Sequence, residues 1–250
     1  MNPVDTYFSR VAELLAALCH DERESIASAS EILTEQIRSD GLIYVFGVGG
    51  HSVIGTEEFF WRAGGLANIS PLFDVSLLLS GGGRKSTLLE RVPGVGDKVV
   101  AAQDLGPQDV LIITSIYGMN AATIDSALEA KRRGVKLIAI TSKEHARKTP
   151  RDFVARHPSG RNLFEIADIT IDNHVPYGDT QIEVVGCSQT VGAVSTILVS
   201  ACIQWLVIAT LELCAENGIE AGVWQSANTV GGDERNAVLM GRFLPRIKAL

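Results

Sequence analysis

A glycine-rich turn follows an apolar segment near residue 47, and its residue types suit the binding of an anion. The segment 42–46 is wholly apolar or aromatic and runs directly into Gly47, Gly49, Gly50 and Ser52. Glycines allow a sharp backbone turn and a close approach to a ligand. A helix that begins near Ser52 would direct unpaired N–H groups, and the positive end of its dipole, toward this turn. The pattern therefore predicts an anion site, most often one for a phosphate.

Small polar residues also follow two further apolar segments that read as strands. Thr114 and Ser115 end one of them, and Thr141 and Ser142 end the other. In parallel sheets, ligands bind beyond the carboxyl ends of the strands, where these hydroxyls are expected to meet the glycine turn. A turn without a ligand would explain an isolated pair of glycines. Three polar strand ends together favour a ligand site.

Three side chains near the turn could move a proton. His51 lies within the turn, and a histidine suits either acid–base chemistry or donation to an anion, because its pKa is close to neutrality. Glu57 and Glu58 follow on the predicted helix. Carboxylates near a helix N-terminus are favoured by the dipole alone, which is the preferred interpretation of Glu57. For Glu58, this interpretation and a role as a base both stay open.

The turn does not have the pattern of a nucleotide site. The dinucleotide fingerprint G-x-G-x-x-G would need a third glycine where this chain has Ser52. No acidic residue ends the second strand to hold a ribose, and no G-K-[ST] sequence is present. The sequence therefore disfavours dinucleotides and P-loop nucleotides, and no cofactor is expected.

Composition narrows the setting. The chain has 250 residues, of which 46% are hydrophobic and 20% charged, as expected of a protein with a full apolar core. Its net charge of -7, with no basic cluster, argues against a nucleic-acid partner. The four cysteines show no C-x-x-C spacing, which favours free thiols in a reducing, cytoplasmic setting. The N-terminal residues lack the pattern of a signal peptide.

Metal binding is not expected either. His20, His145 and His157 have no spacing typical of metal ligands.

An uncharged segment at 191–211 is long enough to span a bilayer. Hydroxyl and amide side chains are scattered through it, so a helix buried in a core or a subunit interface is the favoured interpretation. We therefore expect no membrane partner, and a homodimer or homotetramer.

Helical and strand patterns alternate along the chain, which predicts a parallel sheet covered on both faces. A single domain over 1–250 is expected, with a helical extension at 1–40 and an α/β sandwich with C-terminal helices at 41–250. Asp233 is expected to cap a helix that begins at Glu234, and 143–161 to form a mobile loop. The remaining expected elements are helices at 4–39 (with a possible break at 21–24), 52–62, 86–91, 120–133 and 191–215, and strands at 42–46, 110–114, 135–141 and 167–171, with a short strand within 67–79.

Three motifs resemble the sugar isomerase (SIS) domain. They are Gly47-x-Gly49-x-x-Ser52, Ile113-Thr114-Ser115-x-x-Gly118-x-Asn120 and Ile140-Thr141-Ser142. Longer strings at 85–91, 156–160, 171–179 and 226–234 extend the resemblance over nearly the whole chain, to stand-alone SIS proteins related to phosphoheptose isomerase. The resemblance implies a flavodoxin-like three-layer α/β/α sandwich that binds a sugar phosphate.

The resemblance also implies a phosphate-binding group. It assigns Ser52, Ser115 and Asn120 to the phosphate, with Thr141 or Ser142 nearby, and the glycines Gly49 and Gly50 to the same site. The chain departs from the family where SIS domains usually have a second serine two residues after the first, because Tyr117 stands there.

Catalytic roles follow less directly from the resemblance. Aldose–ketose isomerisation needs a base that moves a proton between adjacent carbons and a group that opens the sugar ring. Glu58 and His51 are the candidates, although the SIS glutamate falls about one turn beyond Glu58. Phosphoheptose isomerase has polar active-site residues in the region that here holds His174, Asp179 and Glu183, and a solvated loop is the competing interpretation.

Related etherases use a second glutamate, which would correspond to Glu90. An exposed helix charge is the preferred interpretation of that residue.

Three functions therefore stay open. The first is a cofactor-independent isomerase, the second a lyase or etherase acting on an N-acetylamino sugar phosphate, and the third a non-catalytic phosphosugar sensor. The sequence leaves the identity of the sugar open.

Overall fold

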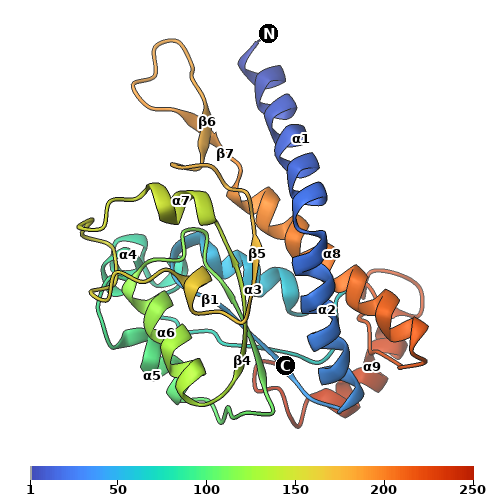
Figure 1. The fold of residues 1–250 in the computed structure, drawn as a ribbon. Coiled ribbons are helices and arrows are strands. Elements are labelled where there is room, and N and C mark those ends of the chain that lie inside the picture. The colour runs from blue at the N-terminus through green and yellow to red at the C-terminus, as the bar shows by residue number, and fades with distance from the viewer. Residues whose placement is uncertain (1) are drawn as a thin grey trace.

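The computed structural model describes residues 2–250 and contains a five-stranded parallel sheet between two layers of helices (Figure 1). The strand order is β2-β1-β3-β4-β5, which is the flavodoxin-like order, with its switch point between β1 and β3. The expected fold class is confirmed. The strands are β1 (Ile43–Gly47), β2 (Ile69–Pro71), β3 (Val110–Thr114), β4 (Lys136–Thr141) and β5 (Ile169–Asp172).

Alternate side chains of the central strands pack into two separate cores. Ile112 and Ile138 belong to one core, whereas their neighbours Leu111 and Leu137 belong to the other. Successive strand residues point to opposite faces, so a strand covered on both faces needs an unbroken apolar run. This requirement explains why 110–114 is buried throughout. Pro71 lies on the edge strand β2, where a missing N–H is tolerated.

The helices divide between the two faces of the sheet. The core that contains Ile112 packs against α2 (Arg23–Arg38), α3 (Val53–Phe59) and α8 (Ser195–Glu216). The core that contains Leu111 packs against α5 (Val95–Ala101) and α6 (Ala121–Arg132). The other helices are α1 (Pro3–Asp21), α4 (Gly83–Leu89), α7 (Lys143–Lys148) and α9 (Gly232–Phe243), with short 3-10 turns at Gly50–Ser52, Leu79–Gly81 and Leu163–Glu165.

The start of α1 and a small hairpin extend beyond the sheet together (Figure 1). The hairpin pairs β6 (Thr180–Ile182) with β7 (Val191–Ala193) in antiparallel register. The Tyr7 hydroxyl donates to the Ala193 carbonyl (2.9 Å). Helix α1 therefore supports the base of this hairpin.

The structure corrects several expected elements. The helix expected at 52–62 ends at Phe59, and the helix expected from 191 begins at Ser195, because 191–193 forms β7. The expected loop at 143–161 contains α7, and the short helix α5 was not expected. Asp233 does not cap α9, whose N-cap is Gly231.

Helix α8 is long and apolar enough to cross a membrane by length and composition. In this fold it packs on the sheet through buried side chains such as Leu198, Cys202 and Leu206. Its outer face carries Ile208, which is 57% exposed.

Candidate functional site

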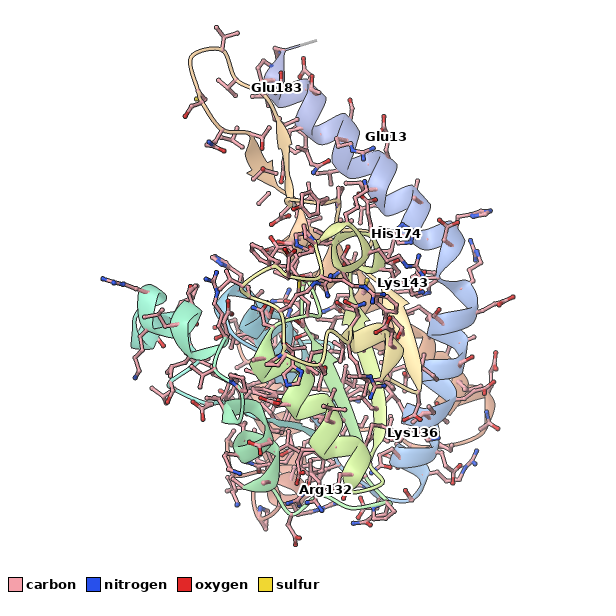
Figure 2. The ribbon with its side chains drawn as sticks, turned by 60° about the vertical axis from the view of Figure 1, so that its left-hand side comes forward. Glu13, Arg132, Lys136, Lys143, His174 and Glu183 are labelled. Carbon is pink, nitrogen blue, oxygen red and sulfur yellow. The ribbon has the colours of Figure 1, made fainter. Side chains whose placement is uncertain are left out.

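The carboxyl ends of the strands point toward the hairpin. Figure 2 shows this for β4, because Lys136 at its start lies near the lower end of the molecule and Lys143, just after its end, lies above it on the side of the hairpin. Glu183, on the hairpin, lies beyond the Lys143 end of the sheet. The loops that leave the strands therefore gather between the sheet and the hairpin.

A cavity of about 320 Å³ opens among these loops, within the range of small-molecule sites. Four parts of the chain form its wall: the glycine turn after β1, the end of α4, the loop between β3 and α6, and the base of the hairpin with the start of α8. The lining residues are Val48, Gly49, Gly50, His51, Ser52, Glu90, Ser115, Ile116, Tyr117, Asn120, Asp179, Ala193, Ser195 and Thr196.

A second hollow of about 410 Å³ lies beside the edge strand β2, lined in part by Tyr44, Phe73, Arg246 and Lys248. This hollow is lined by none of the residues of the three polar strand ends, which are the glycine turn, Thr114–Ser115 and Thr141–Ser142.

The glycine turn has a backbone that only glycine adopts easily. Gly49 and Gly50 have φ of 75° and 48°, in the left-handed region. A Cβ on Gly49 would collide with the Glu90 carboxylate. The Gly50 N–H donates to Ser86 Oγ (3.2 Å), and this hydroxyl donates to the Leu77 carbonyl (2.7 Å). The turn is therefore held against α4, with Glu90 beside it.

Two serines and one asparagine of the predicted phosphate group line the cavity. Ser52 Oγ accepts from the Ile116 N–H (3.3 Å), and Ser115 Oγ accepts from the Gly118 N–H (3.2 Å). Asn120 is the N-cap residue of α6, but its side chain makes no capping hydrogen bond. Its Oδ1 is buried and has no partner among the described residues. A buried polar atom left without a partner is one that a ligand can satisfy.

Glu90 is the carboxyl whose ionisation is altered most clearly at this site. Burial raises its pKa to about 7, and the charge of Arg91 opposes this shift. The carboxyl is therefore poised to gain or lose a proton near neutral pH. The expectation of an exposed helix charge is wrong, because Glu90 is half-buried. Its side chain is covered where α4 packs against the glycine turn.

Tyr117 joins the cavity to a stack of three rings. Its ring stacks on His145 (centroids 3.7 Å apart), and His145 stacks on Tyr177 (4.9 Å). Burial, together with Arg156, lowers the pKa of His145 to about 4, so the imidazole is neutral and its Nδ1 can accept from the Gly178 N–H (3.3 Å). Burial raises the pKa of Tyr117. The stack connects the loop after β3 to the turn that carries Asp179.

Asp179 lines the cavity and also fixes the start of α8. Its Oδ1 accepts from the N–H groups of Val194 (2.9 Å) and Ser195 (2.8 Å), and its Oδ2 accepts from Ser195 Oγ (2.8 Å). A carboxylate is favourable at a helix N-terminus. Asp179 itself has a positive φ of 67°. The hydrogen bonds of this carboxylate tie the hairpin base to α8.

Glu58 is not among the residues brought to the cavity. Its Oε1 accepts from Gln204 Nε2 (2.7 Å) and pairs with Arg62 Nε (3.2 Å). Helix α3 ends at Phe59 and turns this carboxylate toward α8. His51, the other predicted catalytic residue, does line the cavity, with an exposed side chain.

Thr141 and Ser142 are also outside the cavity lining. Thr141 is fully buried. A Cβ on Gly118 would collide with its Oγ1, so Thr141 lies beneath the loop between β3 and α6 and not on the surface of the cavity. Ser142 caps α7: its Oγ accepts from the His145 N–H (3.0 Å) and donates to the Val175 carbonyl (2.6 Å). The structure therefore places both residues outside the cavity lining, and their role at the phosphate stays a prediction.

The two remaining candidates have other surroundings. His174 Nε2 faces Glu22 Oε1 (3.6 Å), and this contact raises the pKa of the histidine. Glu183 is exposed on the hairpin. Within residues 2–250, no group of three or more histidine, cysteine or acidic side chains is arranged to hold a metal ion.

Comparison with known proteins places this geometry in context. Residues 6–142 match the model of the SIS domain. The chain is 36% identical to a UPF0309 protein of Geobacillus kaustophilus, over 99% of this chain and 96% of the relative. It is 34% identical to a UPF0309 protein of Oceanobacillus iheyensis, over 99% of both chains.

Two solved structures share the fold. The phosphoheptose isomerase of Neisseria gonorrhoeae has a TM-score of 0.54 and 17% identity, covering 84% of this chain and 96% of that one. The phosphoheptose isomerase of Francisella tularensis has a TM-score of 0.52 and 16% identity, covering 83% and 95%.

Proposed function

This chain belongs to the SIS domain family, and on that basis we propose that it binds a sugar phosphate and catalyses a cofactor-independent aldose–ketose isomerisation. The observation that carries the proposal is the position of Glu90. A carboxyl with a pKa of about 7 shares one cavity with the glycine turn and the polar end of β3. The solved relatives named as phosphoheptose isomerases are consistent with this chemistry.

The phosphate is assigned to the end of the cavity formed by the glycine turn and the loop after β3. Ser52 and Ser115 offer hydroxyls there, and Gly49 and Gly50 let the backbone approach the anion. The unpartnered Oδ1 of Asn120 is an acceptor, so we assign to it a hydrogen bond from a sugar hydroxyl next to the phosphate. Asp179 on the hairpin side and Glu90 beside Gly49 make part of the wall acidic, so the phosphate is assigned to the side of Ser52 and Ser115 and the sugar hydroxyls to the side of the two carboxyls.

Glu90 is proposed as the base and His51 as the group that opens the ring. His51 gives a proton to the ring oxygen while the anomeric hydroxyl releases its proton to water, which breaks the C1–ring-oxygen bond and leaves the C1 carbonyl. In the open-chain aldose, the Glu90 carboxylate takes the proton from C2, the electron pair forms a C1–C2 double bond, and water gives a proton to the carbonyl oxygen. The product is an enediol. Glu90 then returns its proton to C1 while the C2 hydroxyl gives its proton to water, and the C2 carbonyl of the ketose forms. A base whose pKa lies near the working pH is suited to this exchange.

The direct test is incubation of the purified protein with hexose, pentose and heptose phosphates in D2O. The proposal expects deuterium at C1 or C2 of at least one of them, observed by NMR. Absence of exchange from every sugar phosphate would contradict the isomerase proposal.

Two other functions remain alternatives. Glu90 could equally abstract a proton for elimination from an N-acetylamino sugar phosphate ether, and release of lactate would identify that lyase reaction. A non-catalytic sensor would bind a sugar phosphate with no exchange and no product, in both the wild type and a Glu90→Gln variant.

A further inference from the structure

The phenol of Tyr117 lines the cavity, and its hydroxyl has no hydrogen-bond partner within residues 2–250. Burial raises the pKa of this hydroxyl most, and the charges of Asp179 and Glu90 raise it further. Interactions between charges weaken with distance, so both carboxyls lie near the hydroxyl. The phenol therefore offers its hydroxyl on the side of the cavity that is assigned to the sugar.

Two further rings hold the ring of Tyr117 in place. It stacks on His145 with an angle of 18° between the planes, and His145 stacks on Tyr177 with an angle of 23°. The Gly178 N–H donates to His145 Nδ1 (3.3 Å), which fixes the middle ring of the stack. A donor on a ring held in this way needs little rearrangement when charge develops on a ligand.

The hydroxyl keeps its proton at neutral pH. The pKa of Tyr117 lies above its ordinary value of about 10. The pKa of His145 is lowered to about 4 by burial and by Arg156, so the stacked imidazole brings no positive charge to the phenol. Both oxygens of Asp179 accept hydrogen bonds from the start of α8. Tyr117 is therefore a hydrogen-bond donor beside two carboxyls, which are acceptors when ionised.

The position of this donor suits the oxygen on which the reaction places charge. In the open-chain aldose, the carbonyl carbon C1 is bonded directly to C2, from which Glu90 takes the proton. A donor near Glu90 is thus within reach of the carbonyl oxygen when the base meets C2. A serine at position 117, as SIS domains usually have, would keep its hydroxyl close to the loop backbone, whereas a tyrosine carries it further into the cavity.

We propose that the Tyr117 hydroxyl donates a hydrogen bond to the C1 carbonyl oxygen and stabilises the negative charge that develops there. The inference rests on the proposed function and adds a catalytic residue to it. As Glu90 removes the C2 proton, the electron pair of that bond forms the C1–C2 double bond, and a carbonyl electron pair moves onto the oxygen. Tyr117 keeps its own proton throughout, and water supplies the proton that completes the enediol.

Tyr117→Phe tests this role, because it removes the hydroxyl and keeps the ring of the stack. Deuterium exchange into hexose, pentose and heptose phosphates is followed by NMR as a function of their concentration. The rate at saturation should fall by about 10² to 10³, with KM within about threefold of the wild-type value. Tyr44→Phe is the matched control: Tyr44 is also half-buried with a raised pKa, but it lines the hollow beside β2, and its variant should exchange at the wild-type rate.

A second measurement uses binding alone. The probe is the phosphorylated hydroxamate with one carbon fewer than the sugar phosphate, such as 5-phosphoarabinonohydroxamate for a hexose phosphate. Its nitrogen takes the place of C1 and carries an acidic oxygen where the enediol intermediate has its C1 oxygen. Calorimetry should show that the wild type binds the hydroxamate about 10²-fold more tightly than the sugar phosphate, and that Tyr117→Phe loses about tenfold of this preference.

The outcomes separate the inference from the proposed function. If Tyr117→Phe folds, as judged by its thermal transition, and exchanges at the wild-type rate, the inference is wrong and the isomerase proposal stands. Equal losses in Tyr117→Phe and Tyr44→Phe, or a wild type that binds the hydroxamate no more tightly than the sugar phosphate, would also contradict the inference. If the wild type exchanges deuterium into none of the sugar phosphates, the proposed function fails and the inference fails with it.

Discussion

Glu90 shows how one residue gains its chemistry from its neighbours. Its sequence position, after a run of glycines on a short helix, favours the interpretation of an exposed charge. The packing of α4 against Gly49 leaves Glu90 half-buried, and burial is the main cause of its raised pKa. The sequence around Glu90 does not predict this packing, because the contact joins two segments that are distant along the chain. The glycine turn, by contrast, was predictable, because glycine is the residue that adopts the positive φ values of such a turn most easily.

The raised pKa of Glu90 predicts a specific pH dependence of stability. The folded protein holds this proton more tightly than the unfolded chain, whose carboxyl has a pKa near 4.5. The resulting stabilisation is present below about pH 4.5 and is lost as the pH rises through about 7. Relative to Glu90→Gln, the unfolding free energy of the wild type should fall by about 2 kcal/mol between pH 4.5 and 8, allowing for partial solvent screening. Urea unfolding at the two pH values measures this, and parallel curves for both proteins would contradict it.

Asn120 and Ser142 form an informative pair, because both are helix N-cap residues and only one caps with its side chain. Asn120→Ala should leave the unfolding free energy nearly unchanged and weaken sugar-phosphate binding about tenfold, as expected for one hydrogen bond. Ser142→Ala should lower the unfolding free energy by about 1 kcal/mol and leave binding intact. Thermal unfolding and calorimetry on both variants decide the matter. The reverse result would contradict the assignment of Asn120 to the ligand and would favour a phosphate site at the end of β4.

At the scale of elements, strands were easier to predict than the helices around the site. The central strands are buried on both faces, so their apolar runs identified them. The expected end of α3, at residue 62, was wrong, because the helix ends at Phe59. Glu58 lies within the helix as expected, but on the side that faces α8, where it is bound to Gln204. The segment 143–161 was predicted to be a loop because it is rich in polar residues. In the structure, some of these side chains, such as Arg156, donate to backbone carbonyls instead of facing solvent.

The junction of α1 and α2 depends on one buried carboxylate. Glu22 is 5% exposed, and its Oε2 accepts from the Asp172 N–H (3.0 Å) at the end of β5. Glu22→Ala would leave that N–H without a partner and remove the nearer of the two carboxylates that face His174, so it should lower the unfolding free energy by about 2 to 3 kcal/mol. Glu24→Ala, on the exposed side of α2, is the control and should cost less than about 0.5 kcal/mol. Equal effects from both variants in urea unfolding would show that the junction does not depend on Glu22.

At the scale of the whole molecule, α8 is an apolar helix that the rest of the chain covers only in part. Its inner face packs on the sheet, while Ile208 on its outer face is 57% exposed. The sequence predicted a homodimer or homotetramer because a helix apolar on all sides needs more cover than one sheet provides. Self-association stays a prediction, and the exposed Ile208 offers a position at which to test it.

Ile208→Glu tests the prediction of self-association. Analytical ultracentrifugation of the wild type should give a mass that is a multiple of 26.8 kDa, and Ile208→Glu should shift it toward a smaller species. Val238→Glu, on the exposed face of α9, is the control and should leave the mass unchanged. A wild type that sediments as a single chain would contradict the prediction.

The central claim is that Glu90 moves the proton of a bound sugar phosphate. Glu58→Gln is the matched control, because it makes the same change to a carboxylate outside the cavity. Deuterium exchange into the sugar phosphate, followed by NMR with binding measured in parallel, should fall by about 10² to 10⁴ in Glu90→Gln and stay near the wild-type rate in Glu58→Gln. Both variants should still bind the ligand. Full exchange by Glu90→Gln, or its loss in Glu58→Gln alone, would contradict the assignment.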